Sequence, residues 1–109
     1  MMNEFNSKEE LLKLINTSDL LLCFFTGKCF WGSEDLLCKV DNVLSKYPKI
    51  NSIRIDIDES PSLCAEFSVF IAPTVLLFAQ GKETLRESRF IPLNALEKNI
   101  NRYYNLIFK

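Results

Sequence analysis

A continuous run of apolar residues near the start of the chain constrains the fold most. The run extends from Leu20 to Phe25 and stops at Thr26-Gly27, and it offers no charged residue to either side of a strand. This pattern is typical of a strand that is covered on both faces of a sheet. Apolar residues then recur at three- and four-residue spacing from Phe30 to Tyr47, which predicts a helix that Pro48 ends. The two segments together predict a central strand followed by a helical crossover.

The rest of the chain continues this alternation. Ser7 and Glu10 form a capping box that predicts a helix from Ser7 to about Asn16. Further segments are predicted as a strand over 50–57, a helix over 61–67 capped by Ser60, strands over 74–79 and 83–90, and a helix from Pro92 onward. The tight turn at Gln80-Gly81 implies an antiparallel hairpin. We therefore expect an α/β fold with one mixed four-stranded sheet, with or without a short extra N-terminal strand, and helices on both faces.

The composition fits one domain and excludes several classes of chemistry. The chain has 109 residues, 48% of them apolar, so residues 1–109 are expected to form a single domain. Thirteen basic and fourteen acidic residues give a net charge of −1, which argues against a nucleic-acid or membrane-surface binder. The chain contains no histidine, so triads and metal sites that require histidine are excluded.

The N-terminus and the cysteines indicate a compartment. The opening MMNEFNSKEELL reaches charged residues at once and shows no secretory signal. The longest strongly apolar runs have five or six residues, whereas a membrane span needs about 20. Without a signal, the four cysteines are expected to be thiols in a reducing cytoplasm. They contain no C-x-x-C pair, so a zinc site is disfavoured and no cofactor is expected.

Three motifs in this order and spacing resemble the thioredoxin family over residues 7–108. The segment 28–32, Lys-Cys-Phe-Trp-Gly, follows the central strand where thioredoxins carry Trp-Cys-Gly-Pro-Cys. Residues 55–61, Ile-Asp-Ile-Asp-Glu-Ser-Pro, are similar to the acidic end of the family's next strand. Ala72-Pro73-Thr74, with the apolar strand and turn that follow, looks like the segment around the family's cis-proline. The resemblance implies a thioredoxin fold, a nucleophilic cysteine at Cys29 and a cis peptide bond at Pro73.

The residues around Cys29 favour a reactive thiol. A thiol at the first turn of a helix meets unpaired backbone N–H groups and the positive end of the helix dipole, and both stabilise a thiolate. Lys28 adds a positive charge beside it. The alternative is a small buried core residue, which is the usual role of a cysteine. The candidate site residues are the catalytic Cys29, the supporting Lys28, Gly32, Pro73 and Cys23, and the substrate-binding Phe30, Trp31, Ala72 and Arg89.

The chain departs from the family at the positions that complete dithiol chemistry. The family's resolving cysteine falls on Gly32, and the buried Asp that serves it falls on Cys23. A glycine that keeps the family's substrate groove open falls on Arg89. Arg54 occupies a position where a lysine often neighbours the buried Asp, and it is expected to face Cys23. The expected site therefore has one thiol and an altered substrate surface.

None of the other cysteines is a good resolving partner for Cys29. Cys38 follows it by nine residues and is expected on the opposite side of the same helix. Cys64 lies in the short helix over 61–67 and is expected in the core. A disulfide between Cys23 and Cys29 is disfavoured because it would need Cβ atoms about 3.5–4.5 Å apart.

We expect a monothiol thiol–disulfide oxidoreductase that contributes to cell redox homeostasis. Cys29 would attack a protein or low-molecular-weight disulfide, and an external thiol reductant would release the mixed disulfide. Neither nucleic acid nor a membrane is an expected partner. One alternative is a redox-inactive binding module that uses Phe30, Trp31, Ala72-Pro73 and Arg89 as a contact surface. Another is a cluster held by Cys29 from two copies, as in monothiol glutaredoxins, although their Cys-Gly-Phe-Ser quartet is absent.

Overall fold

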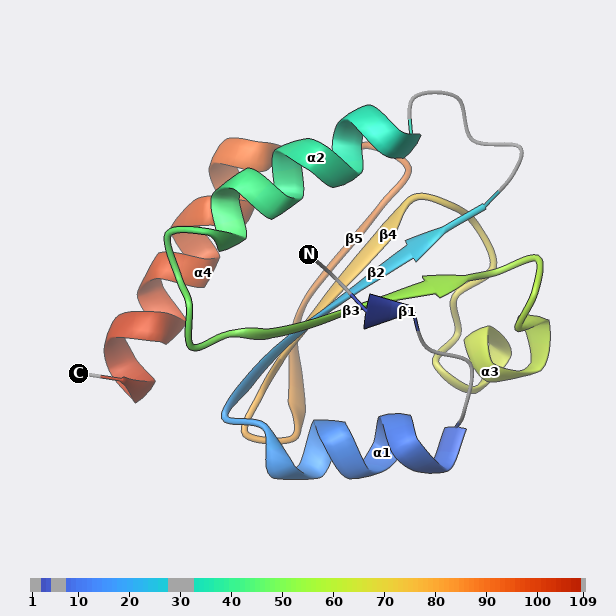
Figure 1. Ribbon diagram of the computed structural model, residues 1–109, viewed down its shortest axis with the longest axis horizontal. Helices are drawn as coiled ribbons and strands as arrows, with labels where there is room; N and C mark the ends of the chain where they lie inside the picture. The colour runs from blue at the N-terminus through green and yellow to red at the C-terminus, as the bar shows by residue number, and fades with distance from the viewer. Residues whose placement is uncertain (1–2, 5–7, 28–32, 109) are drawn as a thin grey trace.

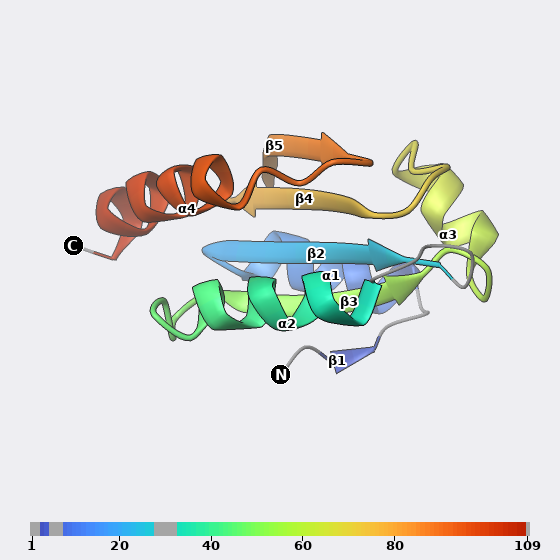
Figure 2. The ribbon, with the colours of Figure 1, turned by 90° about the horizontal axis from the view of Figure 1, so that it is seen from above.

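The strands of the described chain form one mixed sheet in the order β1-β3-β2-β4-β5. The computed structural model describes residues 3–4, 8–27 and 33–108. β1 and β2 run parallel to β3, whereas β4 is antiparallel to both β2 and β5. Figure 2 shows the strands side by side in this order, with β1 and β5 at the two edges of the sheet. The strands are β1 (Asn3–Glu4), β2 (Leu20–Thr26), β3 (Asn51–Asp56), β4 (Thr74–Ala79) and β5 (Lys82–Ser88). The expected mixed sheet is confirmed, and the extra N-terminal strand is present as β1.

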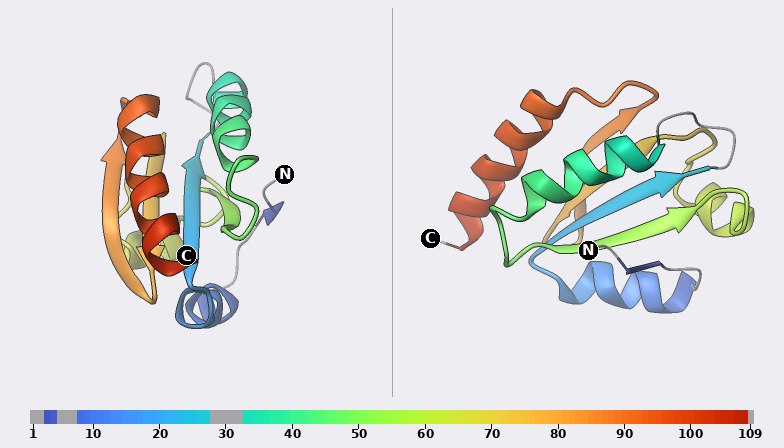
Figure 3. Two further views of the ribbon diagram at one scale, coloured as in Figure 1. Left: turned by 90° about the vertical axis from the view of Figure 1, so that its left-hand side faces the viewer. Right: turned by 45° about the horizontal axis from the view of Figure 1, so that its top comes forward.

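Helices cover both faces of the sheet. They are α1 (Lys8–Thr17), α2 (Ser33–Leu44), α3 (Pro61–Glu66) and α4 (Leu93–Ile107). α2 and α4 lie on one face of the sheet, and α1 and α3 lie on the other (Figure 1 and Figure 3). The side chains of the first pair pack into one buried cluster, and those of the second pair pack into another. No helix in the described part of the chain is both long and apolar enough to cross a membrane.

β2 is the central strand that its apolar run predicted. Every residue from Leu20 to Phe25 is at most 1% exposed. Alternate residues enter the two clusters: Phe24 faces α2 and α4, whereas Cys23 and Phe25 face α1 and α3. Burial of both faces explains why no polar residue interrupts the run.

The hairpin between β4 and β5 closes as the sequence predicted. Ala79 pairs with Lys82, so the loop consists of Gln80 and Gly81. Both loop residues have positive φ, 51° for Gln80 and 84° for Gly81. Two left-handed residues in a two-residue loop match the right-handed twist of the flanking strands, which makes the turn compatible with a tight hairpin.

Two element ends and one predicted helix cap differ clearly from the expectations. β5 ends at Ser88 rather than at Phe90, because Arg89 adopts a φ of 66° that cannot continue a pleated strand. α2 ends at Leu44 rather than at Tyr47. The N–H groups of residues 46 and 47 bond to carbonyls three residues earlier, so the chain after Leu44 forms a tighter turn than an α-helix. Ser60 precedes α3 as expected, but its side chain makes no capping hydrogen bond.

Candidate functional site

The exit of β2 and the segment before β4 meet at one end of the sheet. A β-carbon placed on Gly27 would lie 3.3 Å from the Cβ of Ala72 and 3.2 Å from Cγ1 of Ile57. The N–H of Ile57 also donates to the carbonyl of Thr26 at 2.8 Å, which brings the exit of β3 to the same place. Glycine is the residue that fits here, since a larger one would have to displace one of the two neighbours.

The peptide bond between Ala72 and Pro73 is cis, as the resemblance implied. The carbonyl of Pro73 accepts a hydrogen bond from the N–H of Arg89 at 2.8 Å, which ties the segment to the end of β5. On its other side, Oγ1 of Thr74 donates to the carbonyl of Ile71 at 2.7 Å. Pro73 is buried and Ala72 is partly exposed, so the segment presents a fixed backbone edge to the exit of β2.

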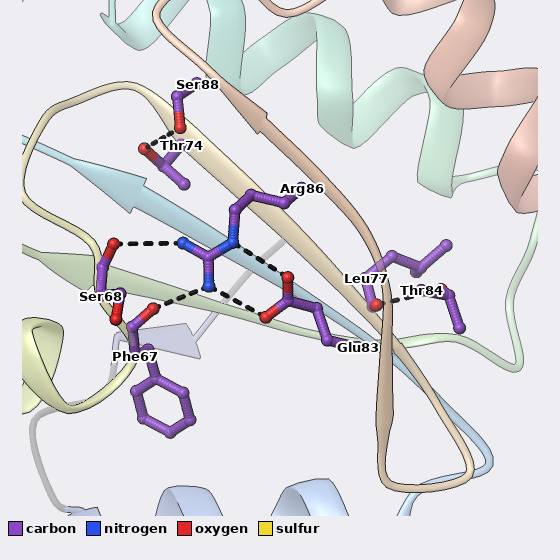
Figure 4. Close-up of polar contacts among 8 residues, drawn as sticks. All are labelled: Phe67, Ser68, Thr74, Leu77, Glu83, Thr84, Arg86 and Ser88. Atoms are coloured by element: carbon purple, nitrogen blue, oxygen red, sulfur yellow. Dashed lines mark hydrogen bonds and ion pairs between the residues drawn. The ribbon is translucent and has the colours of Figure 1, made fainter.

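Arg86 holds the start of the loop that leads to Pro73 (Figure 4). Its guanidinium donates to the carbonyls of Phe67, at 2.7 Å, and Ser68, at 3.2 Å, at the end of α3. Its Nε and Nη2 also donate to the two carboxylate oxygens of Glu83, each at 2.9 Å. The bond to Glu83 raises the pKa of Arg86, so the guanidinium stays charged. We call Arg86, with its bonds to Glu83 and to the carbonyls of Phe67 and Ser68, the clamp. Sequence reasoning missed Arg86, because an arginine on a partly exposed strand gives no signal of the carbonyls that it reaches.

Two cysteines of the described chain are buried and hold their protons. Cys23, 1% exposed in β2, has a pKa raised strongly by burial. Burial, together with the negative charge of Asp56, raises the pKa of the Cys64 thiol to about 11. The expectation that Cys64 belongs to the core is confirmed by its 1% exposure. Cys38 is exposed on α2. Neither buried thiol is suited to act as a nucleophile near neutral pH.

The expectation that Arg54 faces Cys23 is wrong. The parallel register pairs Cys23 with Ile53 and Phe24 with Arg54. Because successive side chains of a strand point to opposite faces, Arg54 lies on the face away from Cys23. Cys23 is instead packed among apolar residues of the cluster under α1 and α3. At the position of the family's buried Asp, this chain therefore has a protonated thiol in apolar surroundings, and Arg54 does not face it.

Five of the candidate residues, Lys28, Cys29, Phe30, Trp31 and Gly32, lie outside the described residues. Predictions made for them remain predictions. The structure does bring Ala72, Pro73 and Arg89 together, at the end of the sheet where Gly27 follows β2. Among the described residues, no group of three or more cysteine, aspartate or glutamate side chains is arranged to hold a metal ion.

Two exposed aromatic residues beside this end of the sheet were not identified from the sequence. Phe70, three residues before Pro73, is 74% exposed, and Phe90, directly after Arg89, is 77% exposed. The predicted strand over 83–90 included Phe90, whereas β5 ends at Ser88 and leaves it outside. The sequence held no separate signal for the exposure of either residue, because exposure here depends on where β5 ends and how the loop before β4 runs.

Comparison with known proteins identifies the family. The family model described as Thioredoxin matches residues 2–102. The chain belongs to the thioredoxin family. It is 31% identical over 98 residues to the thioredoxin of Chlamydia trachomatis, covering 89% of this chain and 94% of that protein. It is also 41% identical over 64 residues to the thioredoxin-like protein YdfQ of Bacillus subtilis, a match that spans 59% of this chain and 57% of that protein.

Solved structures agree on the fold. Oxidised mitochondrial thioredoxin 3 from Saccharomyces cerevisiae superimposes with a TM-score of 0.81 at 24% identity, covering 93% of this chain and 94% of that one. Family and fold together support a thiol–disulfide redox function in general, with protein or other disulfides as substrates and thiols as reductants.

Proposed function

We propose that this member of the thioredoxin family exchanges thiols and disulfides through Cys29 alone, as a monothiol oxidoreductase. The observation that carries the proposal is the close approach of Gly27 to the segment of the cis Ala72-Pro73 bond, which leaves little room for a β-carbon on residue 27. Cys29 follows Gly27 by two residues in the sequence, and Gly32 occupies the position of the family's resolving cysteine. The cis Ala72-Pro73 segment therefore lies beside the end of β2, and the residues that follow β2 in the sequence contain one cysteine, Cys29, rather than two.

The other thiols support a mechanism that uses one cysteine. Cys23 and Cys64 are each 1% exposed and have raised pKa values, so they do not supply a second thiolate. Cys38 lies on the exposed side of α2 rather than in the core. A reductant from outside the chain is therefore part of the proposal, in the reducing cytoplasm that we expect for this protein.

The proposed reaction has two exchange steps. The Cys29 thiolate attacks one sulfur of a substrate disulfide, forming a mixed disulfide and releasing the other substrate sulfur as a thiolate. The thiolate of an external low-molecular-weight thiol then attacks the mixed disulfide at the substrate's sulfur. That step regenerates the Cys29 thiolate and leaves the substrate joined to the external thiol, and a second external thiol reduces this product. Two electrons pass from two external thiols to one disulfide.

Alkylation kinetics test the proposal with an internal reference. Iodoacetamide is added to the reduced native protein across a pH series, and labelling of each cysteine is followed by peptide mass spectrometry. We expect the labelling of Cys29 to have a midpoint well below the ordinary thiol pKa of about 8.5, with the labelling of exposed Cys38 in the same samples as the reference. Equal midpoints for Cys29 and Cys38 would refute an activated thiolate. Cys29→Ser serves as the control for assignment.

A gain-of-function variant tests the missing second thiol. Insulin reduction driven by dithiothreitol should be slow in the native protein, because each mixed disulfide waits for an external thiol. Gly32→Cys should accelerate it by restoring intramolecular release. Cys29→Ser/Gly32→Cys is the matched control and should lose the gain. No gain in the single variant would mean that residues 29–32 do not have the geometry of a dithiol site.

A second candidate function is binding without exchange. The exposure of Phe70, three residues before Pro73, and of Phe90, next to Arg89, favours it, because exposed aromatic residues are typical of protein contact surfaces. A capture experiment separates the two functions. Capture of a partner that survives Cys29→Ser but is lost in Trp31→Ala would support binding alone, whereas dependence on the Cys29 sulfur supports exchange.

A further inference from the structure

A depression beside the candidate site is lined by the exposed, positively charged side chain of Arg89. It has a volume of about 390 Å³ and lies between the first turns of α2 and the loop that joins β5 to α4. Its apolar lining residues are Leu36, Phe90, Ile91 and Leu93. Its charged lining residues are Asp35, Lys39 and Arg89. An apolar floor with a charged edge can accept a side chain and a neighbouring charge at the same time.

The charges that line the depression do not balance. Nζ of Lys39 lies 3.1 Å from Oδ2 of Asp35, one helical turn away, so these two charges offset each other. Within the described residues, the exposed side chain of Arg89 makes neither a hydrogen bond nor an ion pair. The depression therefore presents one unmatched positive charge.

The backbone of Arg89 connects the depression to the candidate site. Its N–H donates to the carbonyl of Pro73 at 2.8 Å, so the edge of the depression begins where the cis-proline segment ends. Arg89 also has a φ of 66°, a conformation that is unfavourable for a residue with a β-carbon and free of strain for glycine. The hydrogen bond to Pro73 helps to hold Arg89 in this conformation, with its side chain at the edge of the depression.

We propose that this depression binds an acidic, apolar segment of the disulfide-bearing protein on which Cys29 acts, an inference that rests on the proposed function. An apolar side chain of the segment packs against Leu36 and Ile91, and an adjacent carboxylate pairs with the guanidinium of Arg89. Charge complementarity selects the partner, because a lysine or arginine at that place would meet the unmatched charge of Arg89. The chain thus gains selectivity at the position where it departs from the family's glycine.

Two matched peptides test this selectivity through the rate of exchange. Each carries one cysteine as a mixed disulfide with 5-thio-2-nitrobenzoate, next to a leucine, and the peptides differ only in glutamates or glutamines beside that leucine. Attack by Cys29 on the peptide sulfur releases the coloured thiolate, and Cys29→Ser gives the background from other thiols. We expect the glutamate peptide to react about two- to five-fold faster at low salt, the factor that one exposed ion pair supplies. The advantage should shrink as ionic strength rises.

Protein variants assign the effect to Arg89. Arg89→Gln should abolish the preference for glutamate, whereas Lys82→Gln, which removes one charge at the far end of β5, should leave it unchanged. Arg89→Gly should also abolish it while the thermal midpoint stays the same or rises, since glycine relieves the φ of 66°. Replacing the peptide's leucine by serine should slow both peptides equally.

Failure of the docking inference and failure of the proposed exchange give different results. Equal rates for the two peptides, or equal effects of Arg89→Gln and Lys82→Gln, would overturn the docking inference and leave the proposed exchange intact. Rates no higher than the Cys29→Ser background would overturn the exchange instead. In that case, fluorescence anisotropy of the reduced, labelled peptides on the Cys29→Ser protein decides the docking: tighter binding of the glutamate peptide supports it, and equal binding overturns it.

Discussion

Replacing Arg86 by methionine should loosen the loop that leads to the cis-proline segment. Methionine keeps most of the apolar stem of the side chain and removes the guanidinium. The carbonyls of Phe67 and Ser68, at the end of α3, then lose the donor that β5 provides. Ser68 itself has a φ of 56°, so this chain end depends on its contacts to keep its conformation.

The size of the effect follows from the exposure of the clamp. The ion pair with Glu83 joins side chains that are 34% and 37% exposed, so it contributes little, about 0.5 kcal/mol. The two bonds to carbonyls, at 2.7 and 3.2 Å, come from a charged donor and together contribute about 1.5 kcal/mol after a discount for exposure. The free energy of unfolding should therefore fall by about 2 kcal/mol. With about 2.1 cal/mol/K of unfolding entropy per residue over 109 residues, this corresponds to about 9 °C in the thermal midpoint.

Urea unfolding and thermal melting of three variants test this reasoning. Glu83→Gln removes the ion pair and leaves the carbonyl contacts, so it should cost about 0.5 kcal/mol. Lys82→Met removes a neighbouring exposed charge and should change stability by less than about 0.5 kcal/mol. If Arg86→Met costs no more than Glu83→Gln, the bonds to Phe67 and Ser68 do not stabilise the fold, and the clamp has no structural role.

Three further outcomes follow from the core thiols and the strand exit. In native protein at pH 8, iodoacetamide should leave Cys23 and Cys64 unlabelled while both react in urea, as mass spectrometry would show; native labelling would contradict their burial. Because the pKa of Cys64 is raised to about 11 from 9.0, its protonated form stabilises the folded state, and roughly 2 kcal/mol should be lost as pH rises from 9 to 11. Denaturant melts of Cys64→Ala should show a smaller loss over that range, and parallel curves would refute the assignment. Gly27→Ala should cost about 1 kcal/mol of stability, and Ile57→Ala should relieve most of that increment; additive costs would argue against the predicted crowding.

The sequence alone predicted the elements whose signals are local. The apolar run of β2, the two-residue turn at Gln80-Gly81 and the spacing of α4 each lie within one short segment. The cis bond before Pro73 was also expected, although through resemblance to a family rather than from local residues. Errors fell at element ends, where one unusual φ, such as that of Arg89, decides whether a strand continues.

The sequence could not predict contacts that depend on register and on the order of strands in the sheet. Arg54 was placed on the wrong face because the pairing partner of Cys23 is Ile53, one position earlier. Arg86 reaches the carbonyl of Phe67 across 19 residues, which requires β5 to lie beside β4 and α3 to end against it. A shift of one residue in either pairing would change the face of every side chain involved.

The sequence by itself determined the buried central strand and a segment, 28–32, that holds one cysteine, Cys29, and has glycine at position 32. Those features are properties of residue identity and local spacing. Only the tertiary structure decided that Gly27 lies close to Ala72, that the N–H of Arg89 bonds to Pro73 while its side chain is left unmatched, and that Cys23 and Cys64 hold their protons. These properties depend on burial and on the approach of segments far apart in the chain, because solvent exclusion and charge pairing exist only once the sheet and its helices have assembled.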